Sequence, residues 1–311
     1  MEERVYRQIL DGIDDGVYFV DRDRRITFWN PGAERITGFT AEEVQGHSCS
    51  EGILRHVSEQ GKQLCLLGCP LSAVMRDGEP RRASVYLHHK EGHRVPVVVR
   101  GDAILDDSGE IVGSVEIFHA TASSRYVADD AGDRADDAHV DPMTLLGSRR
   151  FGERSLEHAL ATLGAPDTSL GLLFLDIDRF KDVNDSHGHA VGDRILRMVG
   201  RTIAHGLRGS DVPVRWGGDE FVVLLPGVDN EGLARNAERL RMLVEHSWFD
   251  SEGVQVRVTV SIGATMAVAG EASDAVVDRA DRLMYVSKSS GRNVVTDDGS
   301  GSGRAAEDPA S

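Results

Sequence analysis

RWGGDEFVVLL, residues 215–225, is the stretch that decides the fold of the second half of the chain. The apolar segment VPVR, residues 212–215, leads into it, and two β-forming segments around a glycine pair predict a tight antiparallel hairpin. Asp219 and Glu220 stand side by side at this turn, where their carboxylates repel each other. A solvated surface turn would tolerate such a pair, whereas a bound cation or a catalytic role would require it. The elements around the hairpin therefore decide between these interpretations.

Length and composition limit the kinds of protein that the chain can be. Its 311 residues, 40% of them hydrophobic, predict about two domains with well-formed cores. The formal net charge of −16 argues against general nucleic-acid binding. No apolar run approaches the roughly 18 residues that span a bilayer, and the N-terminal segment lacks the apolar core of a signal peptide. We therefore expect a cytoplasmic protein with no membrane and no nucleic-acid partner, whose three cysteines form no structural disulfide.

The pattern of turns and apolar segments divides the chain into regions. Residues 1–119 hold several short strands with short helices between them, separated by turn signals such as KEG and DDSG, which predicts a small α+β sheet domain. Residues 120–140 are polar, acidic and rich in alanine, so we expect a linker that can be helical but lacks the apolar heptads of a strong coiled coil. Residues 297–311 are rich in glycine, serine and acidic residues and are predicted to be disordered.

The remaining region, residues 141–296, alternates apolar strands with amphipathic helices. LGLLFLDID, residues 170–178, is typical of a buried strand, and residues 191–207 are typical of a helix with an apolar stripe on one face. The elements expected after the hairpin are a helix over residues 230–246, a strand over residues 254–267 and a helix over residues 272–291. This alternation predicts an α/β domain with a central mixed sheet.

The segment FLDIDRFKDVND, residues 174–185, suggests a chemical role for the hairpin. Asp176 ends a buried strand, at the sheet edge where open α/β proteins bind ligands, and the turn after it offers backbone N–H groups to phosphates beside Lys181. If the hairpin lies beside this strand, Asp176, Asp219 and Glu220 converge. Crowded carboxylates suit a hard cation such as Mg²⁺, and the two glycines let a bulky substrate approach the backbone. These features together predict metal-assisted phosphoryl or nucleotidyl transfer.

The order of these motifs resembles the catalytic domain of diguanylate cyclases, the family named for its Gly-Gly-Asp-Glu-Phe sequence. The resemblance covers residues 141–296 and is carried by DPMT and RR within 141–150, LDIDRFKDVNDSHGHAVGD at 175–193, RWGGDEF at 215–221, VTVSIGAT at 258–265 and ADRLMYVSKSSGRNVV at 280–295. It implies an enzyme that joins two GTP molecules into cyclic di-GMP and releases pyrophosphate. It also implies a homodimer, because each domain holds one GTP and two domains must meet face to face.

The same resemblance implies a role for each matching residue. The divalent cation, Mg²⁺ or Mn²⁺, is held by Asp176, the carbonyl group of Ile177 and Asp219, while Glu220 assists deprotonation of the ribose 3′-hydroxyl. The triphosphate is bound by Lys181, Lys288 and Arg292, and guanine is bound by Asn184 and Asp193. A carboxylate suits guanine, because adenine lacks the N1–H and 2-amino donors and would leave a buried acceptor unpaired.

The resemblance also implies a product-inhibition site, formed by Arg208 and Asp211 in the sequence RGSD together with Arg239. Leu145 and Ser148 depart from the family pattern, which usually has glycine and asparagine there, so we expect an effect on coupling to the N-terminal half rather than on chemistry. Two other functions stay open: a catalytically weak protein that only binds cyclic di-GMP, and a scaffold in which the cyclase domain is incidental. The intact acid pair argues against the first.

Residues 9–47 and 88–118 resemble the opening and closing segments of PAS sensor domains, which implies that the N-terminal half is a regulator. PAS pockets hold haem, flavin, metals, small acids or nothing, and they also serve as partner surfaces. The family resemblance therefore implies the fold without naming a ligand.

The segment 47–71 interrupts this PAS pattern and carries all three cysteines, Cys49, Cys65 and Cys69. Cys65 and Cys69 are four residues apart, so a helix would put them on one face. Nearby in the sequence are His47 and His56, and the histidines that could approach from the strands are His88, His89 and His93. Thiolates and imidazoles suit zinc or an iron–sulfur centre, and a haem is an alternative. The two interpretations are a metal or redox site at His47, Cys49, Cys65 and Cys69, or cysteines packed as small apolar residues.

Overall fold

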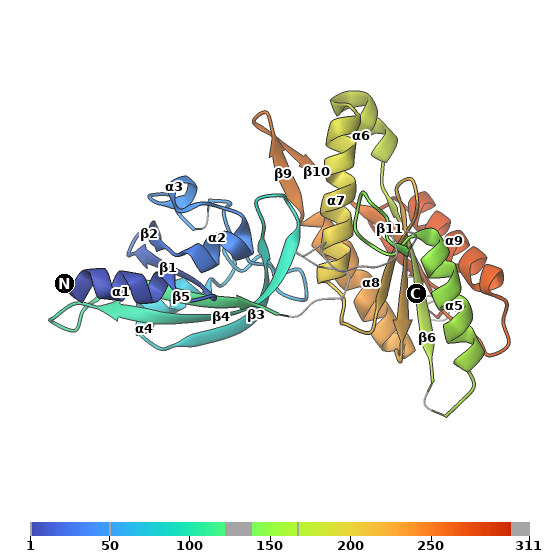
Figure 1. Cartoon of the computed structure of the whole chain (residues 1–311), viewed down its shortest axis with the longest axis horizontal. Coiled ribbons are helices and arrows are strands. Elements are labelled where there is room, and N and C mark those ends of the chain that lie inside the picture. The colour runs from blue at the N-terminus through green and yellow to red at the C-terminus, as the bar shows by residue number, and fades with distance from the viewer. Residues whose placement is uncertain (1, 50, 122–138, 167, 300–311) are drawn as a thin grey trace, which may run out of the picture. The chain divides into compact units, whose positions relative to one another are not determined.

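Figure 1 presents the computed structural model of the chain, which describes residues 2–49, 51–121, 139–166 and 168–299. The chain forms two compact units. The first comprises Met1–Ser123, Arg197–Gly209 and Met242–Arg257, and the second comprises Ser124–Leu196, Ser210–Arg241 and Val258–Ser311. Most of the predicted linker, residues 120–140, and most of the predicted tail, residues 297–311, lie outside the described residues. Within the described ranges, no helix combines the length and the apolar character needed to cross a membrane.

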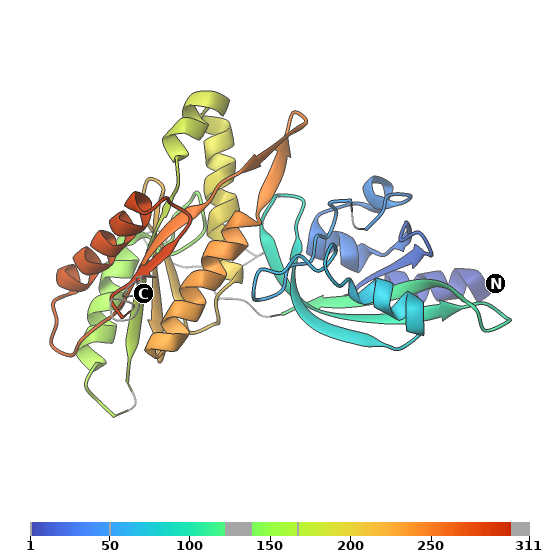
Figure 2. The same ribbon diagram turned by 180° about the vertical axis from the view of Figure 1, so that it is seen from behind.

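An antiparallel sheet of five strands, in the order β2-β1-β5-β4-β3, forms the core of the N-terminal domain. Its strands are β1 (Gly16–Asp21), β2 (Ile26–Trp29), β3 (Arg81–His88), β4 (Arg94–Leu105) and β5 (Ile111–Ala120). Its helices are α1 (Glu2–Asp11), α2 (Pro31–Thr37), α3 (Ala41–Val44) and α4 (Pro70–Asp77). Helix α2 packs on β1, and α4 packs on β4 and β5, which Figure 2 shows from the side of α4. The predicted α+β sheet domain is therefore confirmed.

The side chain of Asn30 joins three segments of this domain. Its Oδ1 accepts hydrogen bonds from the N–H groups of Val17 and Ala33, both at 2.8 Å, so Asn30 caps helix α2 and holds β1. Its Nδ2 donates to the carbonyl groups of Leu10 and Asp15, both at 3.0 Å. Because Asn30 is fully buried, these bonds satisfy its amide and fix the end of α1 near the sheet.

A mixed sheet of five strands, in the order β12-β11-β6-β8-β7, forms the core of the second unit. Its strands are β6 (Leu170–Ile177), β7 (Val212–Gly217), β8 (Glu220–Pro226), β11 (Val260–Met266) and β12 (Val295–Asp297). Strand β6 is buried along its whole length and pairs antiparallel with β8 and β11, whereas β12 is parallel to β11. The helices of this half of the chain are α5 (Arg149–Thr162), α6 (Phe180–His187), α7 (His189–His205), α8 (Asn230–Glu245) and α9 (Ser273–Ser289). The predicted α/β domain with a central mixed sheet is thus confirmed.

The strand predicted over residues 254–267 is in fact two strands, so this prediction was wrong. Strand β10 (Val254–Arg257) pairs with β9 (Trp248–Ser251) in a two-stranded sheet, whereas β11 belongs to the five-stranded sheet. Thr259 lies in the break, and its Oγ1 donates to Asp178 Oδ2 at 2.6 Å. The alternation of apolar residues runs through the break, so periodicity alone could not locate it.

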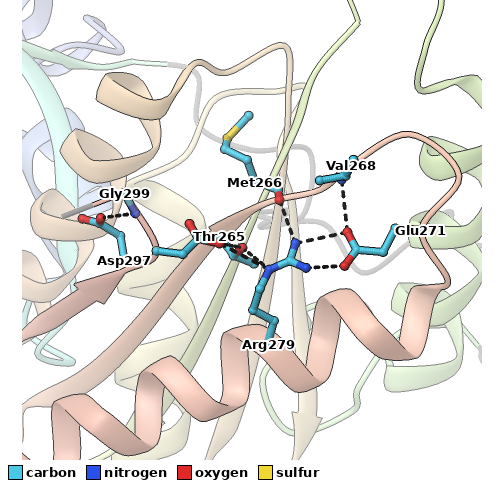
Figure 3. Close-up of polar contacts among 8 residues, drawn as sticks. Thr265, Met266, Val268, Glu271, Arg279, Asp297 and Gly299 are labelled. Carbon is cyan, nitrogen blue, oxygen red and sulfur yellow. Dashed lines mark hydrogen bonds and ion pairs between the residues drawn. The ribbon is translucent and has the colours of Figure 1, made fainter. Parts of the chain in front are cut away.

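Figure 3 shows how the guanidinium group of Arg279 fixes helix α9 to the end of β11. Its Nε donates to Thr265 Oγ1 at 2.6 Å, its Nη2 donates to the Met266 carbonyl at 2.8 Å, and it forms an ion pair with Glu271. These contacts hold α9 on the sheet, and α9 carries Lys288, one of the predicted phosphate ligands.

Candidate active site

The predicted hairpin is present. Strands β7 and β8 pair antiparallel and are joined by the two-residue turn of Gly218 and Asp219. Gly218 has a φ of +51°, in the left-handed region that favours glycine. A Cβ atom at Gly217 or Gly218 would meet nothing within 4 Å, so the space beside the turn is open. The expected approach of a bulky substrate to this backbone requires such an opening.

Strand pairing brings the acids of the turn to the end of the central strand. The register of β6 and β8 places Asp176 directly opposite Glu220. The N–H group of Ile177 donates to the carbonyl group of Asp219 at 3.2 Å, which ties the turn to the strand. The structure therefore gathers the three predicted metal ligands and Glu220, while their roles in metal binding and catalysis stay predictions.

Negative charge is concentrated at this point, where Asp176 is buried and Asp219 and Glu220 are half-buried. Burial raises the pKa of Asp176 to about 6, against the lowering effect of Lys288, whose Nζ lies 2.6 Å from Asp176 Oδ2. Burial also raises the pKa of Glu220, and the charges of Asp219 and Asp281 raise it further. Carboxylates that repel each other in this way favour a hard divalent cation, which takes oxygen ligands. The donor set of two carboxylates and a backbone carbonyl therefore fits Mg²⁺ or Mn²⁺.

Asp178 is a buried residue of the site that the sequence did not identify. Its carboxylate accepts hydrogen bonds from Thr259 Oγ1 at 2.6 Å, from Ser261 Oγ at 2.7 Å and from the N–H group of Asn293 at 3.0 Å. These bonds join the end of β6 to β11 and to the loop that follows α9. The sequence did contain a signal for this residue. Asp178 follows Asp176 at the end of a buried strand, and Thr259 and Ser261 are polar residues within a later apolar segment that could pair with it.

The predicted triphosphate ligands lie on three segments of the second unit. Lys181 is exposed in the first turn of α6, which begins after the left-handed residue Arg179 at a φ of +56°. Lys288 lies in the last turn of α9 and contacts Asp176. Arg292 is exposed in the loop after α9, at a φ of +65°. Lys288 thus lies with the carboxylates, and the exposed side chains of Lys181 and Arg292 are within reach of a phosphate from solution.

The structure also brings the two predicted guanine ligands close together. Asn184 lies in α6 and Asp193 in α7, and a short turn separates these helices. A Cβ atom at Gly192 would lie 2.0 Å from Asn184 Oδ1, so the amide of Asn184 rests on the backbone beside Asp193. Because glycine has no side chain, it alone permits this approach.

The three residues predicted for product inhibition are distributed over both units. Arg208 is exposed and belongs to the first unit. Asp211 and Arg239 belong to the second unit, where Asp211 is buried immediately before β7 and Arg239 donates to Asn236 Oδ1 at 2.5 Å. Their role in product inhibition stays a prediction.

Arg215 connects the start of the second half of the chain to the turn that carries Asp219. Its Nε and Nη2 donate to the carbonyl group of Gly218 at 3.2 and 2.9 Å, and its Nη1 lies 3.2 Å from Asp141 Oδ1. The same carboxylate oxygen accepts from the N–H and hydroxyl groups of Thr144 at 2.9 and 2.7 Å. Sequence reasoning assigned no role to Arg215, which here links the segment after the predicted linker to the turn.

The two departures from the family pattern fall in this same segment. Leu145 has a φ of +61°, in the left-handed region where a leucine is strained. Ser148 is the N-cap residue of α5, and its hydroxyl accepts from the N–H group of Phe151 at 3.4 Å. Position 145 therefore keeps a backbone conformation suited to glycine, and Ser148 caps a helix as an asparagine would.

In the N-terminal domain, Cys65 and Cys69 line one pocket of about 360 Å³ together with Arg24 and Arg76. Cys65 lies in a turn and Cys69 is the N-cap residue of α4, so the two cysteines are not on one helix as expected. The loop between them brings them to the same pocket instead.

The other predicted members of the cysteine site differ in exposure. Cys49 is buried in the apolar core and burial raises the pKa of its thiol, whereas His47 is exposed. Burial likewise raises the pKa of Cys65 to about 11, although its Sγ accepts a hydrogen bond from the N–H group of His56 at 3.3 Å. Protonated buried thiols agree with ordinary packing. A metal, iron–sulfur, haem or redox role for this set stays a prediction.

Comparison with known proteins places the chain in a family. The family described as diguanylate cyclase, GGDEF domain, matches residues 138–294, and the PAS domain family matches residues 14–119. Response regulator PleD from Caulobacter vibrioides is 39% identical over 315 residues, which cover 92% of this chain and 66% of PleD. Probable diguanylate cyclase DgcE from Escherichia coli is 33% identical over 292 residues, which cover 92% of this chain and 25% of DgcE. The chain thus spans a quarter to about two thirds of the length of these relatives.

Solved structures agree with the assignment of the second half. The GGDEF domain of DgcB from Caulobacter crescentus, in complex with c-di-GMP, matches with a TM-score of 0.50 at 32% identity, covering 53% of this chain and 98% of that chain. Diguanylate cyclase SiaD from Pseudomonas aeruginosa, in complex with its activator SiaC, matches with a TM-score of 0.50 at 35% identity, covering 51% of this chain and 61% of that chain. With a PAS domain preceding the matched half, the chain belongs to the GGDEF family of diguanylate cyclase domains.

Proposed function

We propose that the chain is a diguanylate cyclase, which condenses two GTP molecules into cyclic di-GMP and two pyrophosphates. The observation that carries the proposal is the register of β6 and β8, which sets Asp176 opposite Glu220 with Asp219 in the adjoining turn. Family membership and relatives named diguanylate cyclases support it. Because GTP is an intracellular nucleotide, we expect the reaction to take place in the cytoplasm.

In this proposal each acid of the site has one task. Asp176, the carbonyl group of Ile177 and Asp219 hold Mg²⁺ or Mn²⁺, which when bound neutralises charge on the phosphate oxygens. Glu220 accepts the proton of a ribose 3′-hydroxyl, and its raised pKa makes it a stronger base than an ordinary glutamate. The 3′-oxygen then bonds to the α-phosphorus of the second GTP, the bond from that phosphorus to the β-phosphate oxygen breaks, and pyrophosphate leaves.

The remaining residues bind and orient GTP. Lys181, Lys288 and Arg292 offset the charge of the triphosphate, while Asn184 and Asp193 bind the guanine edge. Each domain holds one GTP, so two copies of the chain must meet for the two 3′-hydroxyls to reach the two α-phosphates. The working form is therefore a homodimer.

Regulation acts from two places in this proposal. Cyclic di-GMP binds at Arg208, Asp211 and Arg239 and inhibits its own synthesis; the solved complex of the DgcB GGDEF domain with c-di-GMP supports the binding of product by such a domain. The PAS domain adjusts cyclase output, and the contact of Arg215 with both Asp141 and the Gly218 carbonyl supplies a physical route to the turn.

The pocket lined by Cys65 and Cys69 is the proposed input site for a metal or redox group, with His47 and Cys49 as further members of the set. Anaerobically purified protein should contain iron or zinc in proportion to chain, or change its turnover on oxidation. A Cys65→Ser/Cys69→Ser variant should lose that metal or that sensitivity. Metal-free protein with redox-insensitive turnover would leave the cysteines a packing role.

The product assay tests the central proposal. Purified chain with GTP and Mg²⁺ should yield cyclic di-GMP and pyrophosphate, identified by mass spectrometry, and no product from ATP. Because two chains must meet, specific activity should rise with protein concentration until the dimer is saturated. If the protein binds cyclic di-GMP tightly but forms none from GTP with Mg²⁺ or Mn²⁺, it is a cyclic di-GMP-binding protein instead.

A further inference from the structure

The loop between β3 and β4 of the PAS domain holds a separate group of metal-ligating side chains. Among the described histidines, cysteines and acids, the group found with three or more ligand atoms within 4.8 Å of one another consists of His89, Glu91 and His93. Strand β3 ends at His88 and β4 begins at Arg94, so all three residues lie on this one loop. The cysteines are not members of the group, although the sequence left open that these histidines approach them.

Backbone hydrogen bonds hold this loop in shape. The N–H group of His89 donates to the carbonyl of His93 at 3.0 Å, and the N–H group of Gly92 donates to the carbonyl of His89 at 2.8 Å. Gly92 has a φ of +99°, which only glycine adopts without strain. His89 Nδ1 accepts from the N–H group of Glu91 at 3.0 Å, so its lone pair points into the loop. The three side chains are therefore presented together by a turn that needs no metal to form.

His93 is the buried member of the group and has an unmet bonding requirement. It is 4% exposed, and its Nδ1 is buried with no hydrogen-bond partner. A buried polar atom left unpaired costs roughly 1–3 kcal/mol, so such an atom needs a physical explanation. The His93 ring stacks on the His89 ring with a centroid separation of 4.2 Å. The imidazole that carries the unpaired Nδ1 therefore lies beside the second histidine of the group.

The charge states of the group suit a cation. Burial lowers the pKa of His89 to about 4 and also lowers the pKa of His93, so both imidazoles are neutral at pH 7 and keep a lone pair for a metal. Glu91 is exposed and its Oε2 forms an ion pair with Arg201 of the same compact unit. Ligation through Oε1 would keep this ion pair, and the exposed carboxylate gives a metal a way in from solvent.

We propose that His89, Glu91 and His93 bind one divalent transition-metal cation of the zinc class, with a fourth coordination position open. Two imidazoles and one carboxylate are a ligand set that Zn²⁺ takes in proteins, whereas Mg²⁺ takes oxygen ligands. Metal–nitrogen bonds of roughly 2.0–2.1 Å in a tetrahedron place ligand atoms about 3.3 Å apart. The ligand atoms lie within 4.8 Å of one another, so the side chains must rotate to bring them to this separation. His89 Nδ1 then exchanges its hydrogen bond from Glu91 for the metal.

Zinc titration of the full chain tests the proposal. Chelator-treated protein is titrated with zinc chloride in a calorimeter, in excess Mg²⁺ so that the carboxylate site of the cyclase domain is filled. The compared variants are Glu91→Gln, which keeps the shape of an exposed side chain, and His89→Ala. The control is His119→Ala, which removes an exposed histidine from β5 of the same domain. Loss of outer-shell partners alone costs roughly 10–100-fold in metal affinity, so loss of a ligand should cost at least about 100-fold, while the control keeps wild-type affinity.

A cysteine-free background separates this site from the cysteine pocket. The Cys49→Ser/Cys65→Ser/Cys69→Ser variant should still bind one equivalent of zinc, and its thermal midpoint should rise with zinc concentration as binding to the folded state requires. Adding Glu91→Gln should abolish that rise. Unchanged zinc affinity in both loop variants, or no zinc bound in the cysteine-free background, would overturn the proposal. Neither readout involves GTP, so these results are independent of cyclase activity.

Discussion

The carboxylate of Asp178 accepts a hydrogen bond from the backbone N–H group of Asn293 at 3.0 Å, which ties the end of the central strand to the residue after Arg292. Asp178 is buried, and its other bonds reach Ser261 in β11 and Thr259 just before that strand. The geometry of the site therefore depends on a residue that lies behind it.

Asp178→Asn should lower both stability and turnover. The amide keeps one acceptor oxygen but faces the Thr259 and Ser261 hydroxyls and the Asn293 N–H with an NH₂ group, so at least one buried donor loses its partner. We expect a loss of about 1–3 kcal/mol in the free energy of unfolding by urea, and a reduced kcat for cyclic di-GMP synthesis. Asp278→Asn, an exposed substitution on α9, is the control. Wild-type stability and kcat in Asp178→Asn would show that this network does not position the site.

Leu145→Gly should change the stability of the protein little. Leucine at a φ of +61° is strained by roughly 1–2 kcal/mol, whereas the extra freedom of glycine in the unfolded chain costs about 0.5–1 kcal/mol. Leu145 is 40% exposed, so more than half of its surface is buried, and losing that burial costs on the order of 1 kcal/mol. Relief of the strain should therefore offset the two costs to within about 1 kcal/mol in chemical denaturation. The exposed Leu67→Gly, at a residue outside the left-handed region, relieves no such strain and should be destabilising. A Leu145→Gly variant that is destabilised as much as Leu67→Gly would mean that the strain at Leu145 contributes nothing.

Glu116 gives the PAS domain a stability that depends on pH. Burial raises its pKa from 4.5 to about 8, and its Oε1 lies 3.6 Å from His56 Nε2, whose pKa burial lowers from 6.5 to about 4. Between pH 4.5 and about pH 8, Glu116 holds its proton in the folded state and loses it in the unfolded state. The free energy of unfolding therefore falls as pH rises through this range. His56 acts in the opposite direction, but only below about pH 6.5, where the unfolded histidine gains its proton.

In the wild type, the free energy of unfolding should fall between pH 6.5 and about pH 8, and the Glu116→Gln variant should not show this fall. In the wild type the slope from this residue approaches about 1.4 kcal/mol per pH unit, because unfolding releases one proton from Glu116 and that release becomes more favourable as pH rises. Urea unfolding at several pH values measures how the free energy of unfolding changes with pH, and this slope does not depend on any pH-independent effect of the substitution. Glu110→Gln is the exposed control. Parallel pH profiles for wild type and Glu116→Gln would show that Glu116 is ionised in the folded protein.

Arg208→Ala should weaken product inhibition without changing the chemistry. Loss of a charged hydrogen-bonding group costs about 1.5–3 kcal/mol, so the affinity for cyclic di-GMP should fall roughly 10–100-fold in calorimetry, and more product should accumulate before synthesis stops. Arg197→Ala, which removes an exposed arginine from α7, should leave both unchanged. If the affinity is unaltered in Arg208→Ala, the inhibitory site is elsewhere.

Much of the site could be predicted because it rests on local patterns. The glycine pair and flanking β-formers predicted the hairpin of β7 and β8, and the sequence predicted that its acids would meet Asp176 if the hairpin lay beside the buried strand. Strand pairing then leaves few registers, and the observed one sets Asp176 opposite Glu220.

The parts that sequence could not predict depend on contacts across the fold. Asp178 resembles any polar residue at a strand end until Thr259, Ser261 and Asn293 are seen around it. The break between β10 and β11 is hidden by continuous apolar alternation. The sequence left open whether the loop histidines approach the cysteines, and the β3–β4 turn groups His89 and His93 with each other and with Glu91.

The rate of cyclic di-GMP formation by Glu220→Gln tests the central claim most directly. The amide keeps the size of the side chain but cannot accept the proton of the 3′-hydroxyl, a task worth roughly 10²–10⁴-fold in rate. At saturating GTP and Mg²⁺, we expect turnover to fall by at least about 100-fold while GTP affinity, measured by calorimetry, and thermal stability stay near those of wild type and of the exposed control Glu157→Gln. Turnover within a few-fold of wild type would contradict the assignment of Asp176, Asp219 and Glu220 as the reaction centre.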